Sequence, residues 1–141
     1  MKSYLMKGEE LYRLIPQRSP IVEVDTLYEV SATEAYTGLT VCENNYFCED
    51  GRLSEAGLIE HIAQSAAAFA GYTTYLRGEE PHLGFIGEIK KCKIYELPVL
   101  GSDLHTWIKF VSDVNGVSLM TATTIVDVRK VAECQIKIFL R

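Results

Sequence analysis

One stretch of the sequence, Arg52 to Gly78, limits the possible fold more than any other, because it predicts a long helix with almost no polar face. Ser54 can cap its N-terminus, Glu55 places negative charge in its first turn, and Gly78 is a typical C-terminal stop. A helix that is apolar all round is a buried helix. Glu60 is the one carboxylate inside this apolar run, and its presence there has to be explained.

Polar residues near the middle of this helix argue against a membrane span. Glu60, His61 and Gln64 interrupt the apolar run. The many small residues indicate instead that other backbone, such as a curved sheet, packs closely around the helix. The chain has 141 residues, of which 48% are hydrophobic, and this is enough to bury the core of one domain. We therefore expect residues 1–141 to form a single domain.

Charge and cysteine spacing exclude several classes of protein. Lysine and arginine total 14 against 19 acidic residues, and the net charge of -5 argues against a nucleic-acid binder. The N-terminal residues contain no apolar run long enough for a signal peptide. The four cysteines are widely spaced and form no C-x-x-C pair, so we expect reduced thiols in the cytoplasm. This pattern predicts neither a metal site nor a cofactor.

Alternating residues predict strands on both sides of the helix. A short helix at 8–14 and strands at 21–30 and 34–42 come before it, and a loop at 43–52 leads into it. Strands are predicted after it at 82–97, 104–114, 117–128 and 131–140. Asn115-Gly116 is the strongest hairpin signal, and such short links imply antiparallel pairing. The predicted class is α+β, with a sheet of about six strands wrapped around one long central helix.

Three local motifs accompany this order of elements. Residues 14–18 read Leu-Ile-Pro-Gln-Arg and are followed by Asp25. Glu60 is followed four residues later by Gln64, and residues 98–104 form a turn with glycine and aspartate. Together these features resemble the hotdog fold and, within it, the (3R)-hydroxyacyl-[acyl-carrier-protein] dehydratases of fatty-acid synthesis.

One position departs from the dehydratase pattern. Those enzymes carry a histidine in the loop before the helix, and counting back from Glu60 places it at Tyr46, followed by the matching Phe47. The segment from Phe47 to Gln64 is more similar to a divergent group of dehydratase-like proteins from aryl-polyene clusters, with His61 at an aromatic position. The resemblance therefore implies a dehydratase-like protein that lacks the usual catalytic histidine.

Dehydration of a 3-hydroxyacyl thioester, carried by acyl carrier protein or CoA, needs three groups. A base removes a C2 proton, an acid protonates the departing 3-hydroxyl, and donors stabilise the thioester oxygen. A fully buried Glu60 would keep a proton and could act as the acid. Gln64 lies one turn further on the same face and could orient that carboxyl. Backbone amides at the helix start, up to Gly57, are the expected donors.

The base is the group that this sequence does not supply. Tyr46 is a poor base at neutral pH, so we expect Tyr46, Asn45 and Phe47 to contact substrate instead. One hypothesis is a heterodimer in which this chain supplies Glu60 and a histidine-bearing hotdog partner supplies the base. The alternative is a homodimer, and in either dimer the strand that starts near His82 would lie at the interface and cover an exposed sheet edge.

Two further activities stay open at this point. The missing histidine favours a non-catalytic acyl-binding subunit, and a helix carboxylate also fits a hotdog thioesterase that activates water or attacks the thioester. Basic residues on the predicted strands are solvated faces or docking sites for an acidic carrier protein. They are Lys90, Lys91, Lys93, Arg129 and Lys130.

The remaining candidates have structural interpretations. His61 is adjacent to Glu60 and points about 100° away around the helix, so we expect a packed or hydrogen-bonded histidine. His82 and His105 fall in predicted strands and are expected at the surface. Cys48 lies near the expected site without a partner in sequence, and we expect it to be inert.

Overall fold

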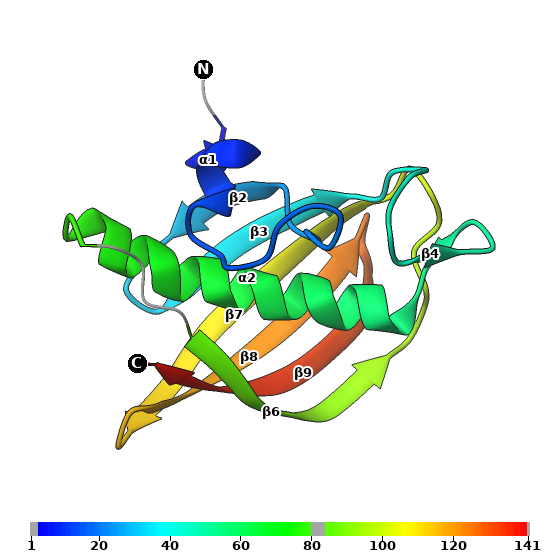
Figure 1. Cartoon of the computed structure of the whole chain (residues 1–141). Coiled ribbons are helices and arrows are strands. Elements are labelled where there is room, and N and C mark those ends of the chain that lie inside the picture. The colour runs from blue at the N-terminus through cyan, green and yellow to red at the C-terminus, as the bar shows by residue number, and fades with distance from the viewer. Residues whose placement is uncertain (1–2, 80–83, 141) are drawn as a thin grey trace.

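Helix α2 and one curved sheet make up most of the molecule (Figure 1). The computed structural model describes residues 3–79 and 84–140. Helix α2 (Glu55–Leu76) crosses one face of a seven-stranded sheet with the order β1-β2-β3-β7-β8-β9-β6. Neighbouring strands in this sheet are antiparallel. The arrangement confirms the predicted α+β class and the long central helix.

The strands follow the predicted segments, mostly with shorter ends. The main sheet consists of β1 (Met6–Lys7), β2 (Thr26–Val30), β3 (Glu34–Thr40), β6 (Gly84–Ile94), β7 (Asp103–Val114), β8 (Val117–Val126) and β9 (Arg129–Leu140). Helix α1 is Glu9–Tyr12, and β4 (Cys48–Glu49) pairs with β5 (Arg52–Leu53) outside the main sheet. The two-residue β1 pairs with β2 and explains why the sheet has seven strands rather than about six. Residues 82 and 83, at the start of the predicted strand 82–97, lie outside the described residues.

The chain before β2 departs from the prediction. The sequence predicts a strand from Ile21, but β2 begins only at Thr26. The backbone amide of Glu23 donates to the side-chain oxygen of Gln64 on α2 at 2.6 Å rather than to a neighbouring strand. Because this bond ties the segment to the helix, residues 21–24 run beside α2. The predicted loop 43–52 also differs, since it contains the short β4–β5 hairpin.

Helix α2 is a core helix whose ends match the sequence signals. Ser54 caps it by accepting a hydrogen bond from the Gly57 amide, and most side chains in its first four turns are buried. A Cβ at Gly71 would come within 2.5 Å of the Leu14 carbonyl oxygen. Backbone therefore packs closely on the helix, and at this point it is the segment after α1 rather than the sheet. Within the described residues, no helix has the length and hydrophobicity needed to cross a membrane.

Candidate active site around Glu60 and Glu23

Glu60 lies on α2 and is half-buried, so the expectation of a fully buried carboxyl is wrong. The sheet covers a different side of the helix. His61 and Ser65 face the sheet and are fully buried, where they bond Thr106 on β7 and Thr37 on β3. Since Glu60 points about 100° away from His61, it faces the edge of this packed surface. A ligand can approach a carboxyl group in that position.

Gln64 connects Glu60 to the segment before β2. Its Nε2 donates to Glu60 Oε2 at 2.8 Å, which is the hydrogen bond that the spacing of the two residues predicts. The same nitrogen donates to the Ile21 carbonyl oxygen at 3.1 Å. Its Oε1 accepts from the Glu23 amide at 2.6 Å. The buried Gln64 amide therefore fixes the Glu60 carboxyl relative to residues 21–23.

Glu23 is the site residue that the sequence analysis missed. Its side chain is 1% exposed, and its Oε1 accepts a hydrogen bond from Asn45 Nδ2 at 2.8 Å. Its Oε2 is buried and has no hydrogen-bond partner in the described part of the chain. Burial raises the pKa of Glu23 to about 7; the Asn45 hydrogen bond opposes this and the charge of Glu60 adds to it. The carboxyl therefore titrates near neutral pH.

The alternating pattern of residues 21–25 explains why the sequence did not indicate Glu23 as a site residue. The pattern predicts a strand with Glu23 on its solvent-facing side, whereas in the structure this segment packs toward the helix. The available signal was a single acid between Val22 and Val24. That pattern fits an exposed strand position equally well, so only the packing against α2 distinguishes the two.

Both ring nitrogens of His61 are engaged in hydrogen bonds, so His61 is not the missing base. Its Nδ1 lies 2.7 Å from the Glu23 carbonyl oxygen, and its Nε2 lies 2.7 Å from Thr106 Oγ1. A carbonyl only accepts, so Nδ1 carries the hydrogen. Burial lowers the pKa of His61 to about 4, so the ring is neutral and Nε2 accepts from the threonine hydroxyl. This confirms the predicted hydrogen-bonded histidine.

The other histidines do not reach the site. Nδ1 of His105 lies 2.7 Å from the hydroxyl of Tyr36. His105 is next to the helix-facing Thr106 on β7, so it lies on the opposite face of the sheet, half-buried rather than fully exposed. The prediction for His82 falls outside the described residues.

A cavity of about 320 Å³ borders Glu23 and contains two of the predicted substrate-binding residues, Asn45 and Tyr46, in its wall. Asn45 links its own loop to Glu23. Its Oδ1 accepts from the Phe47 amide at 2.8 Å, and its Nδ2 donates to the Glu23 carboxyl. The Tyr46 side chain is 61% exposed. The Phe47 ring contacts Tyr46 edge-on, with ring centres 5.1 Å apart, and also packs on the core.

Gly57 has a packing role that the sequence did not indicate. Its amide donates to Ser54 Oγ at 3.2 Å, so it is engaged in the helix cap and not free to bind an oxyanion. The amides of Leu53 and Ser54 are engaged as well, by the carbonyl oxygens of Pro98 and Phe47. A Cβ at position 57 would come within 2.5 Å of the Leu53 side chain. The residue is glycine because other side chains need that space.

The described residues contain no group of three or more His, Cys, Asp or Glu side chains placed to hold a metal ion. Cys42, Cys48, Cys92 and Cys134 are free thiols in the structure. Burial raises the pKa of the Cys48 thiol, and the charge of Glu23 adds to this. A thiol with a raised pKa is a weak nucleophile, as expected for Cys48.

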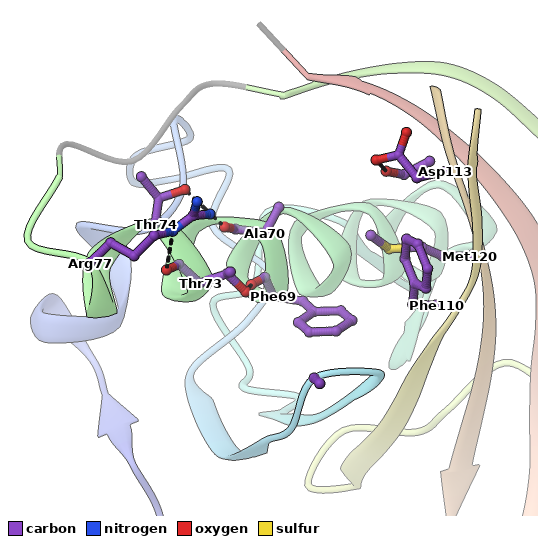
Figure 2. Close-up of a pocket in the computed structure, with 10 residues that line it drawn as sticks. Phe69, Ala70, Thr73, Thr74, Arg77, Phe110, Asp113 and Met120 are labelled. Atoms are coloured by element: carbon purple, nitrogen blue, oxygen red, sulfur yellow. Dashed lines mark hydrogen bonds between the residues drawn. The ribbon is translucent and has the colours of Figure 1, made fainter. Parts of the chain in front are cut away.

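A second cavity, of about 240 Å³, lies at the C-terminal end of α2 (Figure 2). Phe69 and Ala70 from the helix and Phe110 and Met120 from β7 and β8 give it apolar walls. Arg77 and Asp113 lie at separate ends of the view in Figure 2. At 1.5 Å per residue, Ala70 is about 15 Å along the helix from Glu60. This cavity is therefore distinct from the one beside Glu23.

Comparisons with known proteins agree with the architecture. The chain is 28% identical over 141 aligned residues to a 3-hydroxyacyl-[acyl-carrier-protein] dehydratase FabZ from Lactococcus lactis, covering 95% of this chain and 90% of the relative. Among solved structures it is similar to the dehydratase heterocomplex ApeI:P from Xenorhabdus doucetiae, with a TM-score of 0.86, 16% identity, and coverage of 97% and 92% of the two chains. A hypothetical thioesterase from Streptococcus pneumoniae with coenzyme A is less similar, with a TM-score of 0.68, 11% identity, and coverage of 82% and 84%.

These likenesses confirm the hotdog fold that the order of elements predicts. The resemblance to dehydratases is confirmed by a family model, described as ApeP dehydratase, that matches residues 9–141. Since that match covers nearly the whole chain, the protein belongs to the ApeP-like family.

Proposed function

We propose that this chain serves the dehydration of 3-hydroxyacyl thioesters in fatty-acid or polyene synthesis, with Glu60 transferring a proton. Membership of the ApeP-like family and the likeness to a FabZ dehydratase support a dehydratase-like function. The observation that carries the proposal is the 2.8 Å hydrogen bond from Gln64 to Glu60 on the central helix of a chain from this family. It holds a half-buried carboxyl group at the edge of the core, where a thioester can reach it.

A spectroscopic assay tests this function. Incubating the chain with a 3-hydroxyacyl thioester should produce the absorbance of an enoyl thioester, and Glu60→Gln should slow its appearance by about 10² to 10⁴-fold without loss of folded structure. Release of free thiol would indicate a thioesterase instead. Substrate binding with neither product would indicate an acyl-binding subunit. That last reading has a specific observation in its favour, because Tyr46 occupies the histidine position and is 61% exposed.

We propose that the working unit is a dimer with a second hotdog subunit. Strand β6 lies at one end of the sheet and, among residues 3–79 and 84–140, pairs only with β9, so its other edge is available there in the single chain. Exposed strand edges are usually covered in natural proteins. A similar chain belongs to a dehydratase heterocomplex, which supports a hotdog partner here. Sedimentation of the chain alone, and mixed with hotdog homologues from the same cell, separates the homodimer from the heterodimer.

We propose acyl carrier protein or CoA as the carrier of the substrate and the cytoplasm as the location. The exposed Lys91 and Lys93 on β6 and Lys130 on β9 support docking of an acidic carrier protein. Four free thiols fit a reducing compartment. Replacing Lys91 and Lys93 by glutamate should raise KM for a carrier-bound substrate while leaving KM for the CoA thioester nearly unchanged.

A further inference from the structure

We infer that Glu23 is a second catalytic residue of this site, which protonates the departing 3-hydroxyl while Glu60 accepts the C2 proton. The inference rests on the proposed dehydratase function and assigns the two proton-transfer roles within one chain. It reverses the role that the sequence suggests for Glu60. It also replaces the missing histidine with a carboxyl group that the chain itself provides.

The geometry ties the two carboxyl groups together. The side-chain amide of Gln64 donates to Glu60 Oε2 and accepts from the Glu23 backbone amide. On the other side of the same residue, His61 Nδ1 donates to the Glu23 carbonyl oxygen. The Glu23 backbone is thus held at both its amide and its carbonyl by consecutive turns of α2. Its carboxyl group is fixed relative to Glu60.

One oxygen of the Glu23 carboxyl group has no hydrogen-bond partner among the described residues. Asn45 holds Oε1, whereas the buried Oε2 has no partner in the described part of the chain. Glu23 borders the cavity of about 320 Å³ that Asn45 and Tyr46 also line. The hydrogen-bonding capacity of Oε2 is therefore not used by any described protein group, in a side chain that borders this cavity.

The surroundings of Glu23 favour a carboxyl group that still carries a proton near neutral pH. Burial raises the pKa of Glu23 to about 7, and the charge of Glu60 adds to this. The titratable groups around it are Glu60 on α2, Cys48 on β4, and Asp25, Tyr12, Cys42 and Tyr46 around the cavity. None of these side chains is of a cationic type, so none of them stabilises an ionised Glu23 by its charge. A general acid works best when its pKa lies close to the working pH.

The reaction balances with these two groups. The C2–H bond breaks and its proton goes to the Glu60 carboxylate. The electron pair of that bond forms the C2–C3 double bond as the C3–O bond breaks, and the oxygen leaves as water with the proton from Glu23 Oε2. Afterwards Glu60 is protonated and Glu23 is ionised. Exchange with solvent returns both to their starting states.

A purely structural Glu23 would be an unfavourable choice. A buried carboxyl oxygen without a partner lowers stability. The neighbours Val22 and Val24 show that aliphatic side chains are accommodated in this segment. A residue that destabilises the fold, borders a cavity and is tied to Glu60 through Gln64 is better explained by its chemistry.

The test compares Glu23→Gln with wild type in the enoyl thioester assay, using the chain with whichever hotdog partner gives the wild type its activity. We expect kcat to fall by about 10² to 10⁴-fold with little change in KM. In wild type, kcat/KM should fall as the pH rises through about 7, since Glu23 must be protonated. The residual kcat/KM of Glu23→Gln should not show this fall. Exposed Glu29 on β2 provides the matched control, and Glu29→Gln should behave as wild type.

Three outcomes would overturn the inference. If Glu23→Gln keeps wild-type kcat while Glu60→Gln is inactive, the dehydratase function stands and Glu23 is not catalytic. If kcat/KM of the wild type shows no ionisation near neutral pH, Glu23 is not the general acid. This test uses only the wild type, so it is valid even if Glu23→Gln does not fold. If wild type forms no enoyl thioester with any hotdog partner, the proposed function fails and the inference fails with it.

Discussion

Replacing Glu23 by glutamine should raise the free energy of unfolding at high pH and leave it nearly unchanged at low pH. In the folded chain the pKa of Glu23 is raised from 4.5 to about 7, chiefly by burial. At about 1.36 kcal/mol per pKa unit, this difference corresponds to about 3 kcal/mol. Glutamine keeps the shape and can accept the same hydrogen bond from Asn45, but it carries no charge at any pH.

The sign follows from proton binding. Below pH 4.5 the carboxyl is protonated in both the folded and the unfolded chain, so Glu23 contributes no penalty. Between 4.5 and about 7 the unfolded chain loses the proton and the folded chain keeps it, so stability falls as the pH rises. Above about 7 the full penalty is present. Glu23→Gln should therefore exceed wild type by about 3 kcal/mol at about pH 8 and by almost nothing at about pH 4.

Urea unfolding of both proteins across this range measures the difference. His61 has the opposite pH dependence, since burial lowers its pKa to about 4, and stability should fall as the pH drops from 6.5. Both proteins contain His61, so its effect cancels when they are compared. Glu29→Gln is the control for removing an exposed carboxyl. A stability difference that is the same at every pH would refute the reasoning, because it would mean that Glu23 titrates alike in both states.

Three further changes test other parts of the structure. Glu60→Gln should reduce turnover by about 10² to 10⁴-fold with a melting temperature close to wild type; a loss of stability with normal turnover would assign it a structural role. Gly71→Ala should destabilise the fold by about 1–3 kcal/mol in urea unfolding, because its Cβ would lie 2.5 Å from the Leu14 carbonyl oxygen; unchanged stability would contradict that close packing. Tyr46→Phe should leave kcat within about twofold of wild type, since its exposed hydroxyl takes no part in the proton transfers assigned to Glu23 and Glu60; a drop of about 10²-fold would make that hydroxyl part of the catalytic chemistry.

Local sequence signals determined the central helix and one half of the candidate site. The Ser54 cap and the apolar run after it are interactions between near neighbours, so α2 begins and ends close to where the pattern indicates. The Glu60–Gln64 contact depends only on helix geometry, because residues four apart lie on one face. The strands after the helix could be predicted equally well, since alternation and the turn at residues 115–116 are local signals too.

The tertiary structure alone decided which carboxyl is buried and what surrounds it. Glu23 and Gln64 are 41 residues apart, and no local pattern specifies that the amide of one bonds the side chain of the other. That bond turns residues 21–24 away from a strand and toward α2, buries Glu23, and brings Asn45 to its carboxyl group. Glu60 is half-exposed for a related reason, because the sheet packs on the side of the helix that carries His61. A pKa depends on desolvation and on charges that are distant in sequence, so the position of the titrating carboxyl became evident only once the chain had folded around the helix.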